Sequence, residues 1–145
     1  MDDHTFISLR TVEWKDNKVI MIDQTKLPNQ LVFVKYDDYN QVADAIRNLV
    51  VRGAPAIGVS GAFGLALAAL QSKATTKDEL ISDLEKARKI LYDTRPTAVN
   101  LKWGLDKIMI VANSGTTVEQ IKQSVINEAK KMAEEDIQIN KTMGK

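Results

Sequence analysis

The amino-acid sequence predicts an α+β fold in which a small N-terminal antiparallel β-sheet is followed by a bundle of about five helices. Short runs of β-forming residues fill the first 36 positions, and from Asp37 onward the apolar residues recur every three or four positions. A long uncharged segment in the middle of the chain supplies a helix that the others can surround. We therefore expect a single domain over residues 1–145, with the sheet in residues 1–36 and the helical bundle in residues 37–145.

The strands are placed by two β-forming runs and the polar turn between them. Residues 8–14 and 19–22 are rich in β-formers and are separated by Lys15-Asp16-Asn17-Lys18, which predicts a hairpin. A loop at residues 27–30 then precedes a third short strand at residues 31–34.

Capping residues mark where the amphipathic helices begin. Asp37 or Asp38 is expected to cap the first helix, and Thr76-Lys77-Asp78-Glu79 and Thr116-Thr117-Val118-Glu119 read as capping boxes. Another helix should follow Pro96. The stripes expected to face the core are Val42, Ile46, Leu49 and Val50; Leu80, Leu84, Ala87 and Leu91; Leu101, Leu105, Ile108 and Ala112; and Val118, Ile121, Val125, Ala129 and Met132. Trp14 and Trp103 are assigned to the core by residue type.

The uncharged segment at residues 53–72 predicts a buried helix over residues 54–70. It is at the short limit for a membrane span, contains several glycines and one proline, and has no flanking aromatic belt. Gly58, Gly61 and Gly64 recur along it, and each weakens a helix by about 1 kcal/mol relative to alanine. We expect close packing of a neighbouring element against these glycines to compensate.

Composition excludes several classes of function. Lys and Arg total 20 against 19 Asp and Glu, a formal charge of +1, so neither nucleic acid nor a membrane surface is implied as a partner. The chain has no cysteine, which excludes disulfides, thiolate metal sites and a cysteine nucleophile. The one histidine, His4, lies in a polar N-terminus, and no acidic residue has a partner spaced for acid–base chemistry. These residues give no reason to expect a metal site.

Two segments repeat a design suited to binding an anion. Arg52-Gly53-Ala54-Pro55 and Thr94-Arg95-Pro96-Thr97 each place an arginine before a proline that suits the first position of a helix. A helix start offers unpaired N–H groups and the positive end of the helix dipole, and a guanidinium adds donors matched to phosphate oxygens. We expect the two guanidinium groups to meet around one phosphoryl group. The residues alone leave open that both arginines merely pair with surface carboxylates.

Five segments in order resemble the methylthioribose-1-phosphate isomerase family. They are Leu9-Arg10-Thr11-Val12-Glu13-Trp14; Asp23-Gln24 with Leu27-Pro28; Arg52-Gly53-Ala54-Pro55-Ala56-Ile57-Gly58-Val59; Thr94-Arg95-Pro96-Thr97-Ala98-Val99-Asn100-Leu101; and Glu135-Asp136 with Asn140-Lys141. The wider superfamily includes regulatory subunits of a translation-initiation exchange factor and archaeal ribose-1,5-bisphosphate isomerases.

The resemblance implies a cytoplasmic, cofactor-independent aldose–ketose isomerase of methionine salvage, which converts 5-methylthioribose 1-phosphate to 5-methylthioribulose 1-phosphate. By position, Arg52, Gly53, Ala54 and Arg95 match the residues of the family that contact the substrate. The catalytic cysteine of the family, in a Thr-His-Cys-Asn segment, and its catalytic aspartate belong to a C-terminal Rossmann-like domain that this sequence lacks. No catalytic residue is therefore expected here, and the family also suggests a homodimer.

The expected function is thus the N-terminal half of an isomerase, which contributes phosphate contacts and is inactive by itself. A non-catalytic regulatory subunit or interaction module related to the exchange-factor subunits is the alternative from another class. A fragment of a ribose-1,5-bisphosphate isomerase and a helical domain without a ligand are the remaining alternatives.

Overall fold

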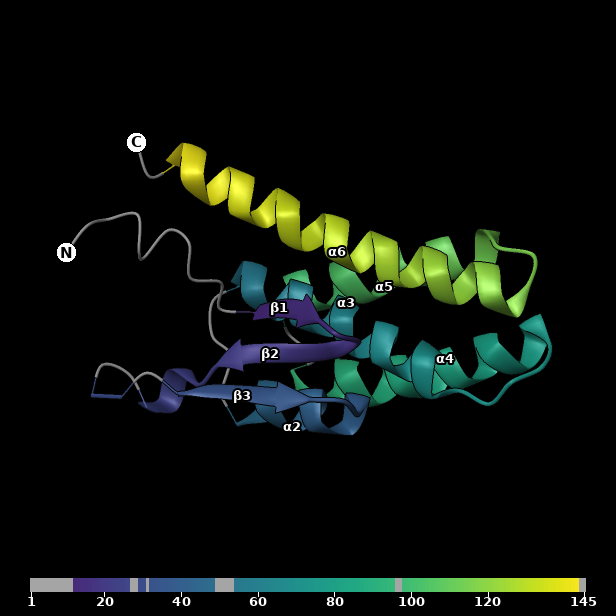
Figure 1. Cartoon of the computed structure of the whole chain (residues 1–145), viewed down its shortest axis with the longest axis horizontal. Helices are drawn as coiled ribbons and strands as arrows, with labels where there is room; N and C mark the ends of the chain where they lie inside the picture. Colours follow the sequence, from purple (N-terminus) through teal and green to yellow (C-terminus); the bar gives the residue numbers. More distant parts are fainter. Residues whose placement is uncertain (1–11, 27–28, 31, 49–53, 96–97, 144–145) are drawn as a thin grey trace.

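The computed structural model of the protein describes residues 12–26, 29–30, 32–48, 54–95 and 98–143. The strands are β1 (Val12–Lys15), β2 (Lys18–Ile22) and β3 (Phe33–Tyr36), with a short 3-10 helix η1 (Gln24–Lys26) between the last two. The α-helices of the described residues are α2 (Tyr39–Arg47), α3 (Ala54–Gln71), α4 (Lys77–Thr94), α5 (Val99–Ser114) and α6 (Val118–Met143). The expected fold class, a small antiparallel sheet followed by a bundle of five helices, is confirmed (Figure 1).

The predicted hairpin is formed by β1 and β2. Asp16 and Asn17 connect the strands with φ angles of 55° and 61°, the left-handed conformations that a tight two-residue hairpin turn needs. Asparagine and aspartate tolerate this conformation better than most residues, which explains their position in the turn. Pairing runs from Val12 opposite Met21 to Lys15 opposite Lys18.

The third strand begins later than the sequence predicted. We expected it at residues 31–34, but β3 covers Phe33–Tyr36 and pairs antiparallel with β2, with Ile22 opposite Phe33. Leu31 lies outside the described residues. The strand alternates between exposed residues and the partly buried Val34 and Tyr36, so its buried face has a period of two. The prediction was wrong because it followed the continuous apolar run at residues 31–34 instead of this alternation.

Asp23 stabilises the turn from β2 into η1. Its buried carboxylate Oδ1 accepts hydrogen bonds from the Thr25 N–H at 2.9 Å and the Thr25 hydroxyl at 2.5 Å. The ring of Tyr36 lies in the same region, where burial raises the pKa of its hydroxyl and the charges of Asp23 and Asp44 raise it further.

Side-chain caps begin α2 and α4 where the sequence placed them. Asp38 caps α2 by accepting the Asn40 N–H at 2.7 Å. Thr76 caps α4 by accepting the N–H three residues later at 3.2 Å. The box predicted on Thr116 is displaced by one residue, because Thr117 accepts the Gln120 N–H at 3.1 Å.

The predicted core stripes are buried wherever the structure describes them, apart from Val118, which is only partly buried. Leu49 and Val50 lie outside the described residues. The fully or nearly fully buried members are Val42, Ile46, Leu80, Leu84, Ala87, Leu91, Leu101, Leu105, Ile108, Ala112, Ile121, Val125, Ala129 and Met132. Trp14 is partly buried, with its ring 5.6 Å from that of Phe63. The assignment of Trp103 to the core is wrong, because its side chain is 57% exposed.

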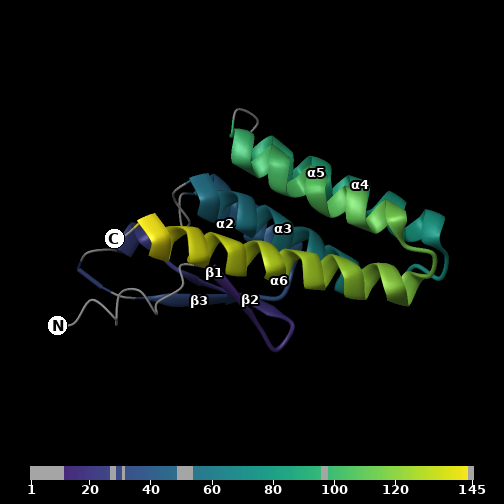
Figure 2. The same cartoon turned by 90° about the horizontal axis from the view of Figure 1, so that it is seen from above.

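Helix α3 is the centre of the fold. Every residue from position 57 to position 69 is buried, and α3 packs against each of the other α-helices. The sheet and the α4–α5 pair lie on opposite sides of α3 (Figure 2). The described residues include no helix long and apolar enough to cross a membrane.

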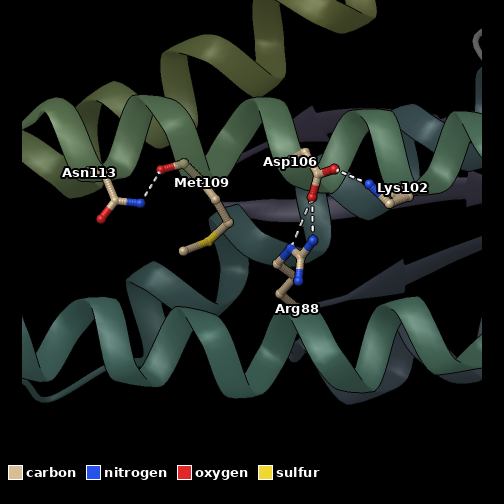
Figure 3. A network of polar contacts seen from close by, with 5 residues as sticks. All are labelled: Arg88, Lys102, Asp106, Met109 and Asn113. Carbon is tan, nitrogen blue, oxygen red and sulfur yellow. Dashed lines mark hydrogen bonds and ion pairs between the residues drawn. The ribbon is translucent and has the colours of Figure 1, made fainter.

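An ion-pair network joins α4 to α5 at the surface (Figure 3). The Asp106 carboxylate forms ion pairs with Arg88 of α4 and with Lys102 of the preceding turn of α5, whose Nζ lies 2.8 Å away. Burial opposes ionisation of Asp106, but the hydrogen bonds from Lys102 and Arg88 outweigh it and hold the pKa of this carboxyl below its ordinary value. One turn further along, the Asn113 amide donates to the Met109 carbonyl at 2.8 Å.

Candidate anion-binding site

The helices alternate in direction, so that two of them begin at the same end of the bundle. Helices α3 and α5 both start where α2, α4 and α6 end, at the left in both Figure 1 and Figure 2. We call this the Arg95 end of the bundle and define it by Ala54, Arg95 and Val99.

Backbone contact between glycines holds the two helix starts side by side. A Cβ atom built on Gly104 would lie 2.5 Å from the Gly58 carbonyl oxygen, and one built on Gly58 would lie 2.8 Å from the Asn100 carbonyl oxygen. Gly58 lies about one turn after Ala54, and Asn100 is the second residue of α5. Helices α3 and α5 therefore touch within their first two turns, which explains why glycine occupies these positions and confirms the close packing expected from the sequence.

In the part of the chain that the structure describes, the N-terminus of α5 has no side-chain cap. Its N-cap residue is Ala98, which offers no side-chain acceptor, whereas α2, α4 and α6 are capped by Asp38, Thr76 and Thr117. The N–H groups of the first turn of an α-helix have no acceptor within the helix. At the Arg95 end, α5 therefore presents N–H donors that no cap of its own satisfies. Alanine at position 98, where Ser, Thr, Asp or Asn would be expected as a cap, indicates an uncapped helix start, and the sequence prediction did not use this feature.

Arg95 lies where α4 ends and the chain turns toward α5. Its N–H donates to the Tyr92 carbonyl at 3.2 Å, and its own carbonyl accepts the Ala98 N–H at 3.0 Å. The partly buried side chain reaches the last turn of α2, where Nε lies 3.4 Å from the Ile46 carbonyl oxygen. Among the described residues no carboxylate pairs with this guanidinium. The described residues therefore give no support to the alternative that Arg95 merely pairs with a surface carboxylate.

The other predicted site residues can be placed only in part. Ala54 is the first residue of α3, and Pro55 the second. Arg52, Gly53 and Pro96 lie outside the described residues, so the meeting of two guanidinium groups around one phosphoryl group stays a prediction. The helix expected after Pro96 is confirmed as α5, but its first residue is Val99 and not the proline.

A shallow hollow at the opposite end of the bundle is a weaker candidate. It is lined by Lys73, Ala74, Asp78, Glu79, Ser82 and Asp83. Two of its carboxylates already have partners: Asp83 accepts the Ser72 hydroxyl at 2.6 Å, and Glu79 accepts the Thr75 N–H at 3.2 Å. The hydrogen bonds from Thr75, followed by that from Thr76, lower the pKa of Glu79. No cluster in the described part of the chain has the acidic or imidazole ligands to hold a metal ion.

The structure defines an α+β domain in which α3 and α5 start at the same end of the bundle, next to Arg95. The chain belongs to the Initiation factor 2 subunit family, whose model matches residues 50–145. This match covers both arginine-containing segments.

Curated relatives include methylthioribose-1-phosphate isomerases. The protein of that name from Geobacter metallireducens is 44% identical over 141 residues, which cover 96% of this chain and 41% of the relative. A putative methylthioribose-1-phosphate isomerase from Pyrococcus horikoshii is 47% identical over 137 residues, covering 93% of this chain and 38% of the relative. The chain thus spans about two fifths of the length of the relatives it matches.

Solved structures with the same fold carry two different names. The 5-methylthioribose 1-phosphate isomerase from Pyrococcus horikoshii aligns with a TM-score of 0.85 at 45% identity, covering 93% of this chain and 39% of that one. The translation initiation factor eIF-2B, subunit delta, from A. fulgidus aligns with the same TM-score and identity, covering 90% of this chain and 38% of that one. Similarity alone therefore does not decide between an isomerase and an initiation-factor subunit.

Proposed function

We propose that this chain forms the N-terminal, substrate-contacting part of a cytoplasmic methylthioribose-1-phosphate isomerase of methionine salvage. The observation that carries the proposal is the Arg95 end, where the uncapped start of α5 lies beside the start of α3 and next to an arginine without a carboxylate partner in the described part of the chain. The relatives named above support the substrate class.

The geometry suits the phosphoryl group of a sugar phosphate. Backbone N–H groups at two adjacent helix starts add their dipoles at one point, and a dianion placed there is stabilised by both. Arg95 adds charge-assisted hydrogen bonds, and its contact with the Ile46 carbonyl holds the side chain at this end of the bundle. In this proposal Arg52 and Gly53 complete the site from the start of α3.

The chain by itself is proposed to bind the substrate without isomerising it. Aldose–ketose isomerisation moves a proton between neighbouring carbons and needs an acid–base group at the reacting atoms. The sequence has no cysteine to match the catalytic residue that the family resemblance implies, and the polar groups of the Arg95 end are suited to holding phosphate. Measurable turnover of 5-methylthioribose 1-phosphate by the purified chain would overturn this division of roles.

Calorimetric titration with 5-methylthioribose 1-phosphate tests the binding site. Arg95→Gln should weaken binding by about 10- to 150-fold, because a hydrogen bond to a charged group contributes about 1.5 to 3 kcal/mol. Arg47→Gln is the matched control: it removes the same charge near the same end, but Arg47 is exposed and already pairs with Asp44 at 2.7 Å. Equal affinities of the wild type and of the Arg95 variant would contradict the proposal.

A regulatory or interaction module is the second candidate, favoured by the similarity to the initiation-factor subunit. This function requires a protein partner instead of a metabolite. Retention of a purified translation initiation factor by the immobilised chain, unaffected by Arg95→Gln and accompanied by no sugar-phosphate binding, would favour it over the isomerase proposal.

A further inference from the structure

An apolar stripe on α5 faces solvent. It consists of Val99, Trp103 and Ile110, whose side chains are 77%, 57% and 68% exposed. At about 100° per residue, Trp103 and Ile110 lie about 40° and about 20° around the helix from Val99, so the three share one face. We call this face the α5 stripe. The opposite face of the same helix carries Leu101, Leu105, Ile108 and Ala112, which are buried against the rest of the fold.

The charged residues beside the α5 stripe are already paired within the chain. On the side of α4, Asp106 binds Arg88 and Lys102. On the side of α6, Lys107 lies 3.5 Å from the Glu128 carboxylate and 4.9 Å from the centre of the Trp103 ring. A partner that covers the stripe therefore need not supply a counter-charge for these groups, and an apolar surface fits it best.

The stripe begins at the Arg95 end, where α6 also finishes. Val99 is the first residue of α5, and the last turns of α6 extend past the other helices at this end (Figures 1 and 2). A polypeptide segment that follows α6 would thus emerge at the same end of the bundle as the proposed phosphate site and the first turn of the stripe.

We propose that the α5 stripe is the docking surface for the second domain of the isomerase, the portion of the relatives' length that this chain does not span. The chain covers 41% of the Geobacter metallireducens relative, so most of that protein remains to cover the surface. This inference rests on the proposed function, because docking on the stripe would bring the second domain over the phosphoryl group held at the Arg95 end. The apolar character of the three side chains and the internal pairing of the neighbouring charges select a domain with an apolar contact face.

Hydroxyl-radical footprinting read by mass spectrometry measures the exposure of these side chains directly. The full chain is compared with the same chain fused to the remainder of the Geobacter metallireducens isomerase, in place of the matched 141 residues. Oxidation of Trp103 should fall several-fold in the fused protein. Phe33 on β3, 53% exposed and on the opposite side of α3, should be oxidised equally in both. Unchanged oxidation of Trp103 would refute the docking surface.

Two further readouts separate this inference from its alternatives. Light scattering of the unfused chain should give a monomer, and a dimer in which Trp103 is protected would assign the stripe to a second copy instead. Trp103→Ser should lower the Tm of the fused protein and leave that of the unfused chain unchanged, whereas Phe33→Ser should not distinguish the two. A fused protein that protects Trp103 but lacks isomerase activity would retain the docking surface and refute the proposed function. An active fused protein in which Trp103 stays exposed would support the proposed function and refute the docking surface.

Discussion

Replacing Gly104 by alanine tests the helix crossing that holds the two helix starts together. In an ordinary helix interior the substitution stabilises by about 1 kcal/mol, because alanine has the higher helix propensity. Here the new methyl group would lie 2.5 Å from the Gly58 carbonyl oxygen and 3.2 Å from its carbonyl carbon. Both atoms belong to the backbone of α3, so neither can rotate away, and the helices must separate by about 1 Å to reach an ordinary contact distance.

The magnitude follows from these opposing effects. Overpacking a tight contact costs about 1 to 3 kcal/mol, and a backbone-to-backbone clash belongs at the upper end of that range. After the gain in helix propensity, Gly104→Ala should lower the free energy of unfolding by about 1 to 2 kcal/mol. It should also weaken sugar-phosphate binding, because the start of α5 moves relative to the start of α3.

Urea unfolding followed by circular dichroism at the helical band measures the stability, with Gly64→Ala as the matched control. A methyl group on Gly64 would meet the Leu91 Cδ1 atom at 2.9 Å, and this flexible side chain can move. The control should therefore be close to neutral. A Gly104→Ala protein as stable as the wild type, or more stable, would refute the inferred backbone contact between α3 and α5.

Three further predictions concern the charges and caps of the fold. Asp106→Asn breaks the network that joins α4 to α5 and should lower the free energy of unfolding by about 0.5 to 1 kcal/mol near pH 7, since these pairs are partly exposed. Because folding lowers the pKa of the Asp106 carboxyl, the wild type should lose the same stability as the pH falls below about 3.8. Acid unfolding of both proteins measures this difference. The hydroxyl of Tyr36 should ionise above its ordinary pKa of 10.0, so the stability that depends on its protonated form is present below that pH and is lost as the pH rises above it. Spectrophotometric titration should show that this pKa falls in Asp44→Asn. Thr76→Ala should cost about 1 kcal/mol by removing the cap of α4, as urea unfolding would report.

Helical periodicity explains why most of the fold could be predicted. The stripe Leu80, Leu84, Ala87 and Leu91 repeats at the spacing of one helix face, and a buried face leaves that trace in the sequence. Trp103 was misplaced because residue type was given more weight than helical position. It lies two residues from Leu101 and therefore about 200° around the helix from the core stripe.

The candidate site could be predicted only in part, because its geometry comes from tertiary packing. The sequence singled out Arg95 as an anion ligand, yet nothing local indicates that its side chain reaches the Ile46 carbonyl 49 positions earlier. The glycines at positions 58 and 104 look like weak helix residues until the crossing of α3 and α5 shows that Gly104 admits the backbone of Gly58, and Gly58 the backbone of Asn100. Sequence patterns report which face of an element is buried, but not which two element ends meet.

The most direct test of the central claim is a titration of the ¹⁵N-labelled chain with 5-methylthioribose 1-phosphate, followed by amide NMR shifts. The Arg95 end predicts that the amides of Ala54, Val99 and Asn100 shift together and saturate with one dissociation constant, and that these shifts disappear in Arg95→Gln. Shifts confined to the hollow around Asp78 and Asp83 at the opposite end of the bundle, or no shifts at any concentration, would contradict the claim that the two helix starts form a phosphate site.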